Sequence, residues 1–269
     1  MVRIAIAQIR STDSAEANLH ISEDLIQQAS SEGAQAIFFP EASDYICSDG
    51  ARCKQLCQPI EYSIFVQGLR KQARKYKLPV AVGIHEPCTD AENTRVKNTL
   101  VWINEAGEVL HRYQKVHMLE MKLSDGPQIH EGDFCQPGRS VLSPFETPIG
   151  RVGAMICFDL RFPSLAQKLV SMGAEILIYP SAFVPNTGEL HWIPLLQARA
   201  IECQAYVIAP DQVGQHNEQR SSYGHSVVID PWGRIIAQLG SEENVLAYAE
   251  IDREQVKHAR QSLFLRKRE

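Results

Sequence analysis

Apolar and polar residues follow two different spacings along the chain. Val or Ile stands at three alternate positions of residues 2–8, which predicts a strand, whereas residues 16–32 carry an apolar stripe with helical spacing that ends at Gly33. The same criteria predict further strands at 36–39, 78–84, 140–145, 151–157, 175–179 and 205–209, and further helices at 60–77, 163–172, 189–203 and 252–262.

Turn residues predict two hairpins. Residues 98–114 fold back at 104–107, and a second hairpin turns at 230–233. Residues 116–139 show no regular period and are rich in Gly, Pro and charged residues. A loop of this length inside a compact domain is usually functional.

Two short segments recur in the same order. Residues 33–40 (Gly-Ala-Gln-Ala-Ile-Phe-Phe-Pro) resemble residues 173–180 (Gly-Ala-Glu-Ile-Leu-Ile-Tyr-Pro), and residues 103–107 resemble residues 229–233. The repeats indicate two related halves, each supplying helices and a sheet. Because continuous apolar strands must be covered on both faces, we predict an α/β fold in which two sheets pack face to face with helices outside. Nothing in the middle resembles a linker, so residues 1–269 are expected to form a single domain.

The composition excludes several classes of protein. With 44% hydrophobic and 22% charged residues, the chain is neither disordered nor of low complexity. A net charge of −5 argues against a general nucleic-acid binder. The first residues do not have the layout of a signal peptide, and no apolar run approaches the ~20 residues of a membrane helix. Seven scattered cysteines fit a reducing compartment. We therefore expect a cytoplasmic protein without a membrane or nucleic-acid partner, and leave a mitochondrial form open.

Cys157 stands between a predicted strand and a predicted helix, in the segment Cys-Phe-Asp-Leu-Arg-Phe-Pro. Proline favours the first position of a helix, so Pro163 predicts that Cys157 lies on a strand-to-helix turn near a helix N-terminus. The partial positive charge of such an end stabilises a thiolate. The segment alone is compatible both with a reactive cysteine and with a small buried core residue.

Two further residues lie where predicted strands end. Glu41 follows the apolar segment Ile-Phe-Phe-Pro, and α/β proteins bind their ligands at the carboxyl ends of strands. A helix N-cap would also explain this carboxylate. Lys115 ends a hairpin strand in Tyr-Gln-Lys-Val-His and opens the long loop, although taken alone it also fits a surface lysine.

Together these segments resemble the nitrilase superfamily of carbon-nitrogen hydrolases, whose members use a Glu-Lys-Cys triad. The resemblance covers nearly the whole chain and implies a four-layer αββα sandwich. The catalytic residues of the family match Glu41, Lys115 and Cys157, and a second buried glutamate of the family matches Glu131. The closest resemblance is to the deaminated-glutathione amidase branch, and it is carried by residues 41–45, 179–183 and 225–233.

This resemblance implies hydrolysis of a small anionic amide through a cysteinyl thioester. The expected substrate is deaminated glutathione, which would yield 2-oxoglutarate and cysteinylglycine. The alternative is an omega-amidase that acts on 2-oxoglutaramate or 2-oxosuccinamate. No cofactor and no metal is expected, and the resemblance implies a homodimer.

Each matched residue suits a step of amide hydrolysis. Glu41 can accept the proton of the thiol, hand it to the leaving amine and later activate water. Lys115 and the backbone N–H of Phe158 suit the stabilisation of the oxyanion. Glu131 is expected to orient Lys115 or the amide nitrogen. Phe158 replaces the Tyr or Trp that is usual in the family, which matters little if this position acts through its backbone.

The residues expected to bind substrate are Arg161, Phe183, Thr187 and Arg220. Arg161 lies four residues after the nucleophile, and its planar guanidinium suits a substrate carboxylate. An internal salt bridge is the alternative role for this side chain. Arg220 is a weaker candidate for a second carboxylate.

Two other features depart from the family pattern. Ser164 replaces a common Glu, and Pro194 lies in a predicted helix. Because proline is tolerated only in the first turn of a helix, we expect this helix to begin near Trp192.

Two competing classes of function stay open. A thiolate and imidazole metal site could be built from Cys47, Cys53, Cys57, His85 and Cys88. The chain could also be a catalytically retired interaction module, although the complete triad argues against this.

Overall fold

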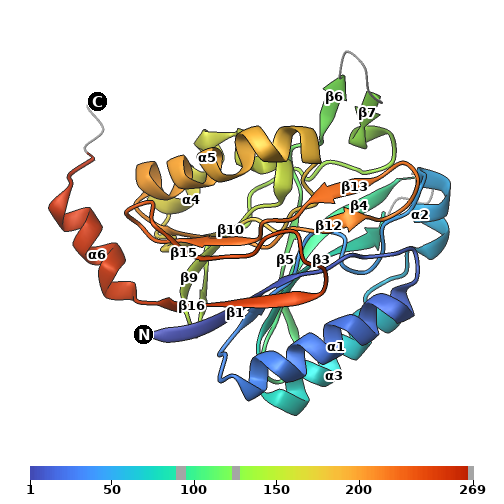
Figure 1. The fold of residues 1–269 in the computed structure, drawn as a ribbon, viewed down its shortest axis with the longest axis horizontal. Coiled ribbons are helices and arrows are strands. Elements are labelled where there is room, and N and C mark those ends of the chain that lie inside the picture. The colour runs from blue at the N-terminus through green and yellow to red at the C-terminus, as the bar shows by residue number, and fades with distance from the viewer. Residues whose placement is uncertain (89–94, 123–127, 266–269) are drawn as a thin grey trace.

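Two sheets lie face to face in the computed structural model, which describes residues 1–88, 95–122 and 128–265 (Figure 1). The first sheet consists, in spatial order, of β16 (Val245–Ile251), β1 (Val2–Gln8), β2 (Ile37–Phe38), β3 (Val80–Pro87), β4 (Val96–Ile103) and β5 (Val109–Gln114). The second consists of β15 (Ile235–Gln238), β14 (Val227–Ile229), β11 (Tyr206–Ala209), β10 (Ile176–Ile178), β9 (Gly150–Ala154) and β8 (Phe145–Thr147).

Helices cover the outer face of each sheet. Helices α1 (Ala15–Ser31) and α3 (Ile64–Tyr76) cover the first sheet, and α4 (Pro163–Ser171) and α5 (Pro185–Cys203) cover the second (Figure 1). Successive side chains of a strand point to opposite faces, so Ile37 packs against α1 and α3 whereas Phe38 packs in the core between the sheets. The predicted α/β sandwich with four layers is therefore confirmed.

The two repeats predicted from the sequence occupy matching places. Strand β2 lies between β1 and β3 and is parallel to both. Strand β10 lies between β9 and β11 and is also parallel to both. Each strand ends shortly before a proline, Pro40 or Pro180, and the two segments that follow meet at the site described below.

Several elements were not predicted from the sequence. They are α2 (Gly50–Leu56), the paired strands β6 (Glu120–Lys122) and β7 (Gln128–His130), the paired strands β12 (Val213–Gln215) and β13 (Ser221–Tyr223), and β16. The segment 116–139 is thus not wholly irregular, although residues 123–127 lie outside the described residues. Helix α6 (Arg253–Ser262) was predicted and is confirmed. No described helix is both long and apolar enough to cross a bilayer.

Two predicted boundaries are wrong, and proline explains both. The strand expected at 140–145 occupies only Phe145–Thr147, since Pro144 has no N–H to give to a sheet ladder. Helix α5 does not begin near Trp192 but at Pro185, which takes the favoured first position and leaves Pro194 inside the helix. Pro194 has no N–H to donate to the carbonyl of residue 190, one turn earlier in the helix. Residues 190 and 194 are both exposed, and the helix tolerates the missing hydrogen bond there.

Candidate active site

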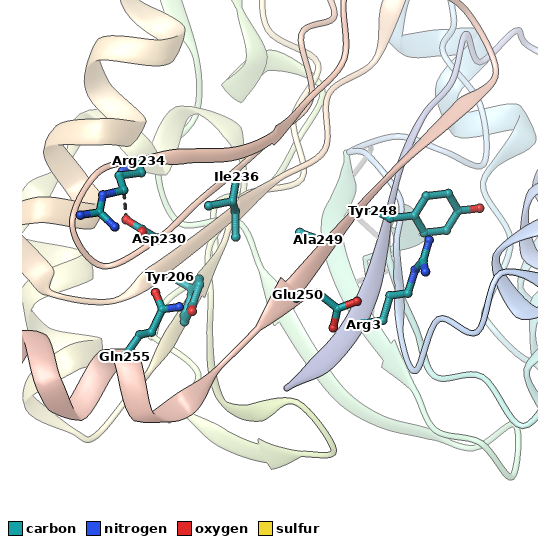
Figure 2. A pocket seen from close by; sticks show the side chains of 9 residues that line it. All are labelled: Arg3, Tyr206, Asp230, Arg234, Ile236, Tyr248, Ala249, Glu250 and Gln255. Atoms are coloured by element: carbon teal, nitrogen blue, oxygen red, sulfur yellow. Dashed lines mark hydrogen bonds between the residues drawn. The ribbon is translucent and has the colours of Figure 1, made fainter.

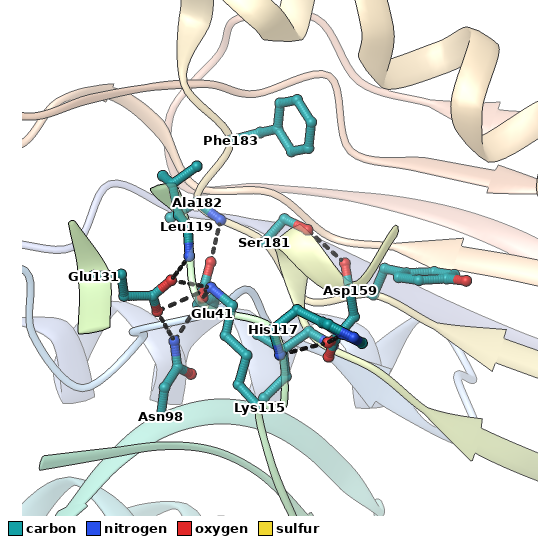
Figure 3. Close-up of polar contacts among 12 residues, drawn as sticks. Glu41, Asn98, Lys115, His117, Leu119, Glu131, Asp159, Ser181, Ala182 and Phe183 are labelled. Atoms are coloured by element: carbon teal, nitrogen blue, oxygen red, sulfur yellow. Dashed lines mark hydrogen bonds and ion pairs between the residues drawn. The ribbon is translucent and has the colours of Figure 1, made fainter. Parts of the chain in front are cut away.

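Glu41 is held at the carboxyl end of the first sheet by a close approach of two backbones. The N–H of Gly83, on β3, donates to the carbonyl oxygen of Pro40 at 3.0 Å. A Cβ atom on Gly83 would lie 2.5 Å from the Cα of Glu41, so only glycine permits this approach. The carboxylate of Glu41 is buried and points toward the other sheet (Figure 3).

Lys115 joins two buried carboxylates. Its Nζ lies 2.9 Å from Oε1 of Glu41 and 2.8 Å from Oε2 of Glu131 (Figure 3). The side chain of Lys115 is 2% exposed, so the protein excludes water from these charges and each one needs a partner of opposite charge. The predicted proximity of Glu41, Lys115 and Glu131 is therefore present in the structure.

Asn98, on β4, belongs to the same network and was missed from the sequence. Its Nδ2 donates to Oε1 of Glu41 at 2.6 Å and to Oε1 of Glu131 at 3.1 Å. The N–H of Leu119 donates to Oε2 of Glu131 at 2.7 Å. The available signal was an amide at the start of a strand whose later residues are apolar, because a buried amide requires partners.

Cys157 reaches the network from the second sheet. It opens a 3-10 turn, Cys157–Arg161, between β9 and α4, with a backbone φ of 44°. This left-handed conformation is strained for a residue other than glycine, and strain of this kind is concentrated at functional sites. The N–H of Cys157 donates to the carbonyl oxygen of Pro180 at 3.0 Å, which fixes the turn against the segment after β10.

The segment after β10 also contacts Glu41 directly. The N–H of Ala182 donates to Oε2 of Glu41 at 2.8 Å (Figure 3). The thiol of Cys157 lies within interaction range of the same carboxylate and of Lys115, since both groups shift its pKa. The three residues predicted to form the triad are thus brought together from both sheets.

Burial and charge shift the protonation of these groups in different directions. Burial raises the pKa of Glu41, but the charge of Lys115 and the hydrogen bonds outweigh it and hold the pKa below its usual value. Burial lowers the pKa of Lys115, but Glu131 and Glu41 raise it well above the usual value. Burial and the charge of Glu41 raise the pKa of the Cys157 thiol well above its usual value. At neutral pH the site therefore holds an ammonium, a carboxylate on Glu41 and a neutral thiol.

Asp159 ties the turn of Cys157 to the first sheet and was also missed. Its buried carboxylate accepts from the N–H of Ile156 at 3.0 Å, the hydroxyl of Tyr113 at 2.7 Å and the N–H of His117 at 3.1 Å. Tyr113 and His117 flank Lys115 in sequence, so one carboxylate positions both sides of the site. An acid inside the apolar run around Cys157 was the signal for this role.

Arg161 lies at the rim of this site. Its Nη atoms are 3.3 Å from Nδ1 of His191, and its guanidinium lies over the rings of Phe158 and Phe183 at 5.7 and 5.4 Å. Within the described residues no Asp or Glu lies within ion-pair distance of Arg161, so the alternative of an internal salt bridge finds no partner there. His191, the acceptor for Arg161, was not predicted.

The other expected substrate-binding residues lie at different places. Phe183 is buried against Trp192, with ring centroids 5.0 Å apart. Thr187 is half-buried in the first turn of α5, where its hydroxyl donates to the carbonyl of Val184 at 3.3 Å. Arg220 is half-buried within electrostatic reach of His85 and His216.

Two other features could provide a binding site: a cluster of metal-ligating side chains and a surface cavity. Among the described residues no three Cys, His, Asp or Glu side chains are arranged to hold a metal ion, so the proposed thiolate and imidazole site finds no geometry there. A cavity of about 550 Å³ lies at the edge strands of both sheets, where Tyr206, Asp230 and Arg234 face Glu250 (Figure 2). Its lining contains no cysteine or serine, and it does not include the network of Glu41, Lys115 and Cys157.

Comparison with known proteins gives consistent results. The family model described as carbon-nitrogen hydrolase matches residues 3–261. The chain is 43% identical to the probable hydrolase nit2 of Schizosaccharomyces pombe, over 97% of this chain and 95% of that protein. It is 40% identical to the deaminated glutathione amidase of Bos taurus, over 97% of this chain and 79% of that protein.

A solved structure agrees with the fold. The crystal structure of the C. elegans NitFhit protein superposes with a TM-score of 0.90 at 34% identity. The match covers 97% of this chain and 63% of that larger protein.

Proposed function

Because this chain belongs to the carbon-nitrogen hydrolase family, we propose that it is a thiol amidase in which Cys157, Glu41 and Lys115 carry out the chemistry. The observation that supports this most is the carboxylate of Glu41. It is held between Nζ of Lys115 and the N–H of Ala182, and it lies within interaction range of the thiol of Cys157. The proposed base, cation and nucleophile therefore lie next to one another in one buried site.

The first step is attack of the Cys157 sulfur on the amide carbon. The thiol is neutral in the resting site, so its proton moves to Glu41 as the carbon–sulfur bond forms. The same proton then passes to the leaving amine as the carbon–nitrogen bond breaks, which leaves a thioester on Cys157. Water, deprotonated by Glu41, hydrolyses the thioester and restores the thiol.

Two donors suit the oxyanion that develops during both steps. Lys115 supplies a permanent positive charge, since its pKa lies well above neutral pH. The N–H of Phe158 is the second donor, because it lies in the first turn of a 3-10 helix, where backbone N–H groups have no acceptor within the helix. Preorganised donors of this kind each contribute ~10²–10³ in rate. Glu131 and Asn98 hold Lys115 and Glu41 in place.

The proposed substrate is a small anionic amide, with deaminated glutathione preferred and 2-oxoglutaramate as the alternative. Arg161 supports the anionic class, because its guanidinium lies at the rim of the site within electrostatic reach of Cys157. The aromatic rings of Phe158 and Phe183 and the acceptor on His191 orient it. The name of the bovine relative supports the specific substrate.

The test is product formation from deaminated glutathione, 2-oxoglutaramate, an N-carbamoyl amine and a nitrile. We expect the highest kcat/KM with deaminated glutathione. The Glu41→Gln variant, which preserves the shape of the side chain, is expected to fall below about a tenth of the wild-type rate. Preference for the nitrile or the carbamoyl amine would contradict the assignment, as would a Glu41→Gln variant that keeps full activity.

Homodimerisation, a single domain over residues 1–269 and a cytoplasmic location without nucleic-acid or membrane partners stay predictions. Leu190 and Ile201 on α5, which are 68% and 49% exposed, support an interface between two copies. Sedimentation analysis of the purified chain tests this point, and a mass of one chain would contradict it.

A further inference from the structure

Three cysteines gather beside the loop that carries Glu41. Cys47 lies on this loop, Cys53 lies on α2, and Cys57 directly follows that helix. Cys47 and Cys53 pack with Tyr45 in a small buried cluster, and Cys57 lies at its rim. None of these sulfurs forms a disulfide, and the proposed amidase reaction uses none of them.

The contacts inside the cluster place Cys53 at its centre. Cys47 and Cys53 pack in the same buried cluster, and each sulfur lies close enough to shift the pKa of the other. The hydroxyl of Tyr45 lies 3.9 Å from the same sulfur and donates to the carbonyl of Cys53 at 3.1 Å. Two cysteines that pack together in one small buried cluster are candidates for a disulfide, which requires Cβ atoms about 3.8 Å apart.

A buried ion pair gives the two sulfurs different protonation states. Nδ1 of His85 lies 2.9 Å from Oδ1 of Asp44, and the imidazole ring stacks on Tyr45 with ring centroids 4.5 Å apart. Although burial lowers it, the charge of Asp44 raises the pKa of His85 to about 9, so the imidazole is protonated at neutral pH.

The hydrogen bond from Cys47 and the positive charge of His85 lower the pKa of Cys53 to about 6, even though burial and Asp44 oppose them. The hydrogen bond to Cys53 and burial raise the pKa of Cys47. The pair therefore contains one thiolate and one thiol. Thiolates are the form that attacks oxidants and disulfides.

A cavity lies beside this cluster, although none of the three cysteines lines it. This cavity of about 270 Å³ is lined by Tyr45, His85 and Leu56, which also surround the thiols, and by Asp44 and Arg52. Cys47 and Cys53 themselves are 5% and 6% exposed, so only a small reagent is expected to reach them.

We propose that Cys53 and Cys47 form a dithiol site that hydrogen peroxide oxidises to a disulfide. The thiolate of Cys53 attacks one peroxide oxygen, the O–O bond breaks, and the departing hydroxide takes a proton to form water. The resulting sulfenic acid on Cys53 is attacked by the sulfur of Cys47. An S–S bond then forms, and the proton of Cys47 leaves with the hydroxyl group as a second water. Two thiols lose two electrons, and one peroxide becomes two waters.

The site predicts an order of reactivity among the cysteines. Cys157 also contacts a charged network, but the carboxylate of Glu41 keeps its thiol neutral, whereas His85 favours the thiolate of Cys53. Peroxide is therefore expected to modify Cys53 before Cys157. Cys57 is the matched control, because it lies in the same cluster but burial raises its pKa to about 12.

The experiment treats the purified chain with an equimolar amount of peroxide at neutral pH, blocks the remaining thiols after denaturation and maps the peptides without reduction. We expect a linked peptide pair containing Cys47 and Cys53 that dithiothreitol separates. Cys47→Ser is expected to leave a sulfenic acid on Cys53 that dimedone labels. Cys57→Ser is expected to form the disulfide at the wild-type rate.

Two variants test the cause of the reactivity. Cys53→Ser is expected to abolish oxidation of the cluster, and His85→Gln to slow it about tenfold, through the loss of thiolate. Oxidation of Cys157 first, a disulfide between Cys53 and Cys57, or an unchanged rate in His85→Gln would each overturn the proposal. Circular dichroism of each variant verifies the fold. If His85→Gln does not fold, the order of labelling in the wild-type chain still decides the question.

Discussion

Strands β2 and β10 occupy matching places in their sheets, and each is followed by a proline whose carbonyl is used in the same way. The carbonyl of Pro40 accepts from Gly83 on the neighbouring strand, and the carbonyl of Pro180 accepts from Cys157 just beyond the neighbouring strand, each at 3.0 Å. The repeated segments thus fix two equivalent corners that face each other across the sandwich.

What each corner contributes is different. The first sheet supplies paired charges, because Glu41, Asn98, Lys115 and Glu131 all come from its strands and loops. The second supplies a strained turn that carries Cys157 and a backbone donor at Ala182. A duplicated framework can therefore build one site when one copy provides charge and the other provides the cysteine proposed as nucleophile and backbone groups.

The largest expected effects separate the two contributions. Cys157→Ala and Lys115→Met are both expected to lower kcat/KM by ~10³-fold or more, because each removes a component of the proposed reaction. They are expected to differ in stability. Lys115→Met leaves two buried carboxylates without a cation and is expected to lower the free energy of unfolding by about 3–5 kcal/mol, whereas Cys157→Ala changes it by about 1 kcal/mol or less.

Amidase assays and urea unfolding of both variants measure this difference. A Lys115→Met chain as stable as the Cys157→Ala chain would show that the charges of the first sheet are not held by mutual pairing.

Arg161 extends the contribution of the second sheet from chemistry to selectivity. Arg161→Met is expected to lower kcat/KM for an anionic amide by ~10²-fold, because a bound carboxylate without its cation costs about 2–5 kcal/mol. A neutral amide is expected to lose much less. The ratio of the two kcat/KM values is the measurement, with Arg220→Met as the control. An equal loss for both amides would make Arg161 a structural residue.

Two glycine substitutions compare the packing beside Glu41 with the packing in β9. Gly83→Ala places a Cβ 2.5 Å from the Cα of Glu41, so backbone must move, and we expect kcat to fall about tenfold. Gly153→Ala in β9 meets only side chains of Leu169 and Ala174, at 3.2 Å, and is expected to retain most of the activity.

Steady-state kinetics and the melting temperatures of both variants measure the contrast. Equal losses in the two variants would contradict the close packing assigned to the Glu41 corner.

Two buried histidines give the smallest predicted effect, with opposite signs. His85 has its pKa raised to about 9 by Asp44, so its contribution to stability is complete below about pH 6.5 and is lost as pH rises through 9. His216 has its pKa lowered to about 4 by burial, so its contribution is present above about pH 6.5 and is lost as pH falls through 4. Each effect is on the order of 1–3 kcal/mol.

Urea unfolding between pH 4 and pH 9.5 measures both effects. His85→Gln is expected to flatten only the alkaline side of the stability profile, and His216→Gln only the acid side. A His85→Gln profile parallel to that of the wild-type chain would show that the pair with Asp44 does not stabilise the fold.

The main elements of the fold could be predicted because their signals are local, and the apolar spacing indicates the long helices. Glu41, Lys115 and Cys157 each end or follow a strand, but only the family resemblance singled them out together, and their catalytic roles stay predictions. Strand β16 could not be predicted in this way, since its residues alternate little between buried and exposed positions. The start of helix α5 was misjudged because Pro185 and Pro194 are each compatible with the first turn of a helix. The exposed position of Pro194 lets it stand inside the helix, which begins at Pro185.

The connections within the site could not be predicted because they join distant segments. Asn98 contacts Glu41 across two strands, and Asp159 reaches Tyr113 and His117 from the opposite sheet. His191 contacts Arg161 from helix α5, which begins about two turns earlier than expected. A buried polar residue in the sequence indicates that its side chain needs hydrogen-bond partners, but it does not identify the segments that supply them.

The pairing of β1 with β16 has a consequence for how the chain is made. All seven residues of β1, Val2–Gln8, pair with Val245–Ile251, so during synthesis β1 waits for a segment that is made much later. Until then the first sheet has an open edge at β1, next to the strand that leads to Glu41. Contacts between residues so far apart in sequence slow folding, and an unpaired edge invites association with other chains. Synthesis that stalls before residue 245 is therefore expected to yield an aggregating nascent chain rather than a partly active enzyme.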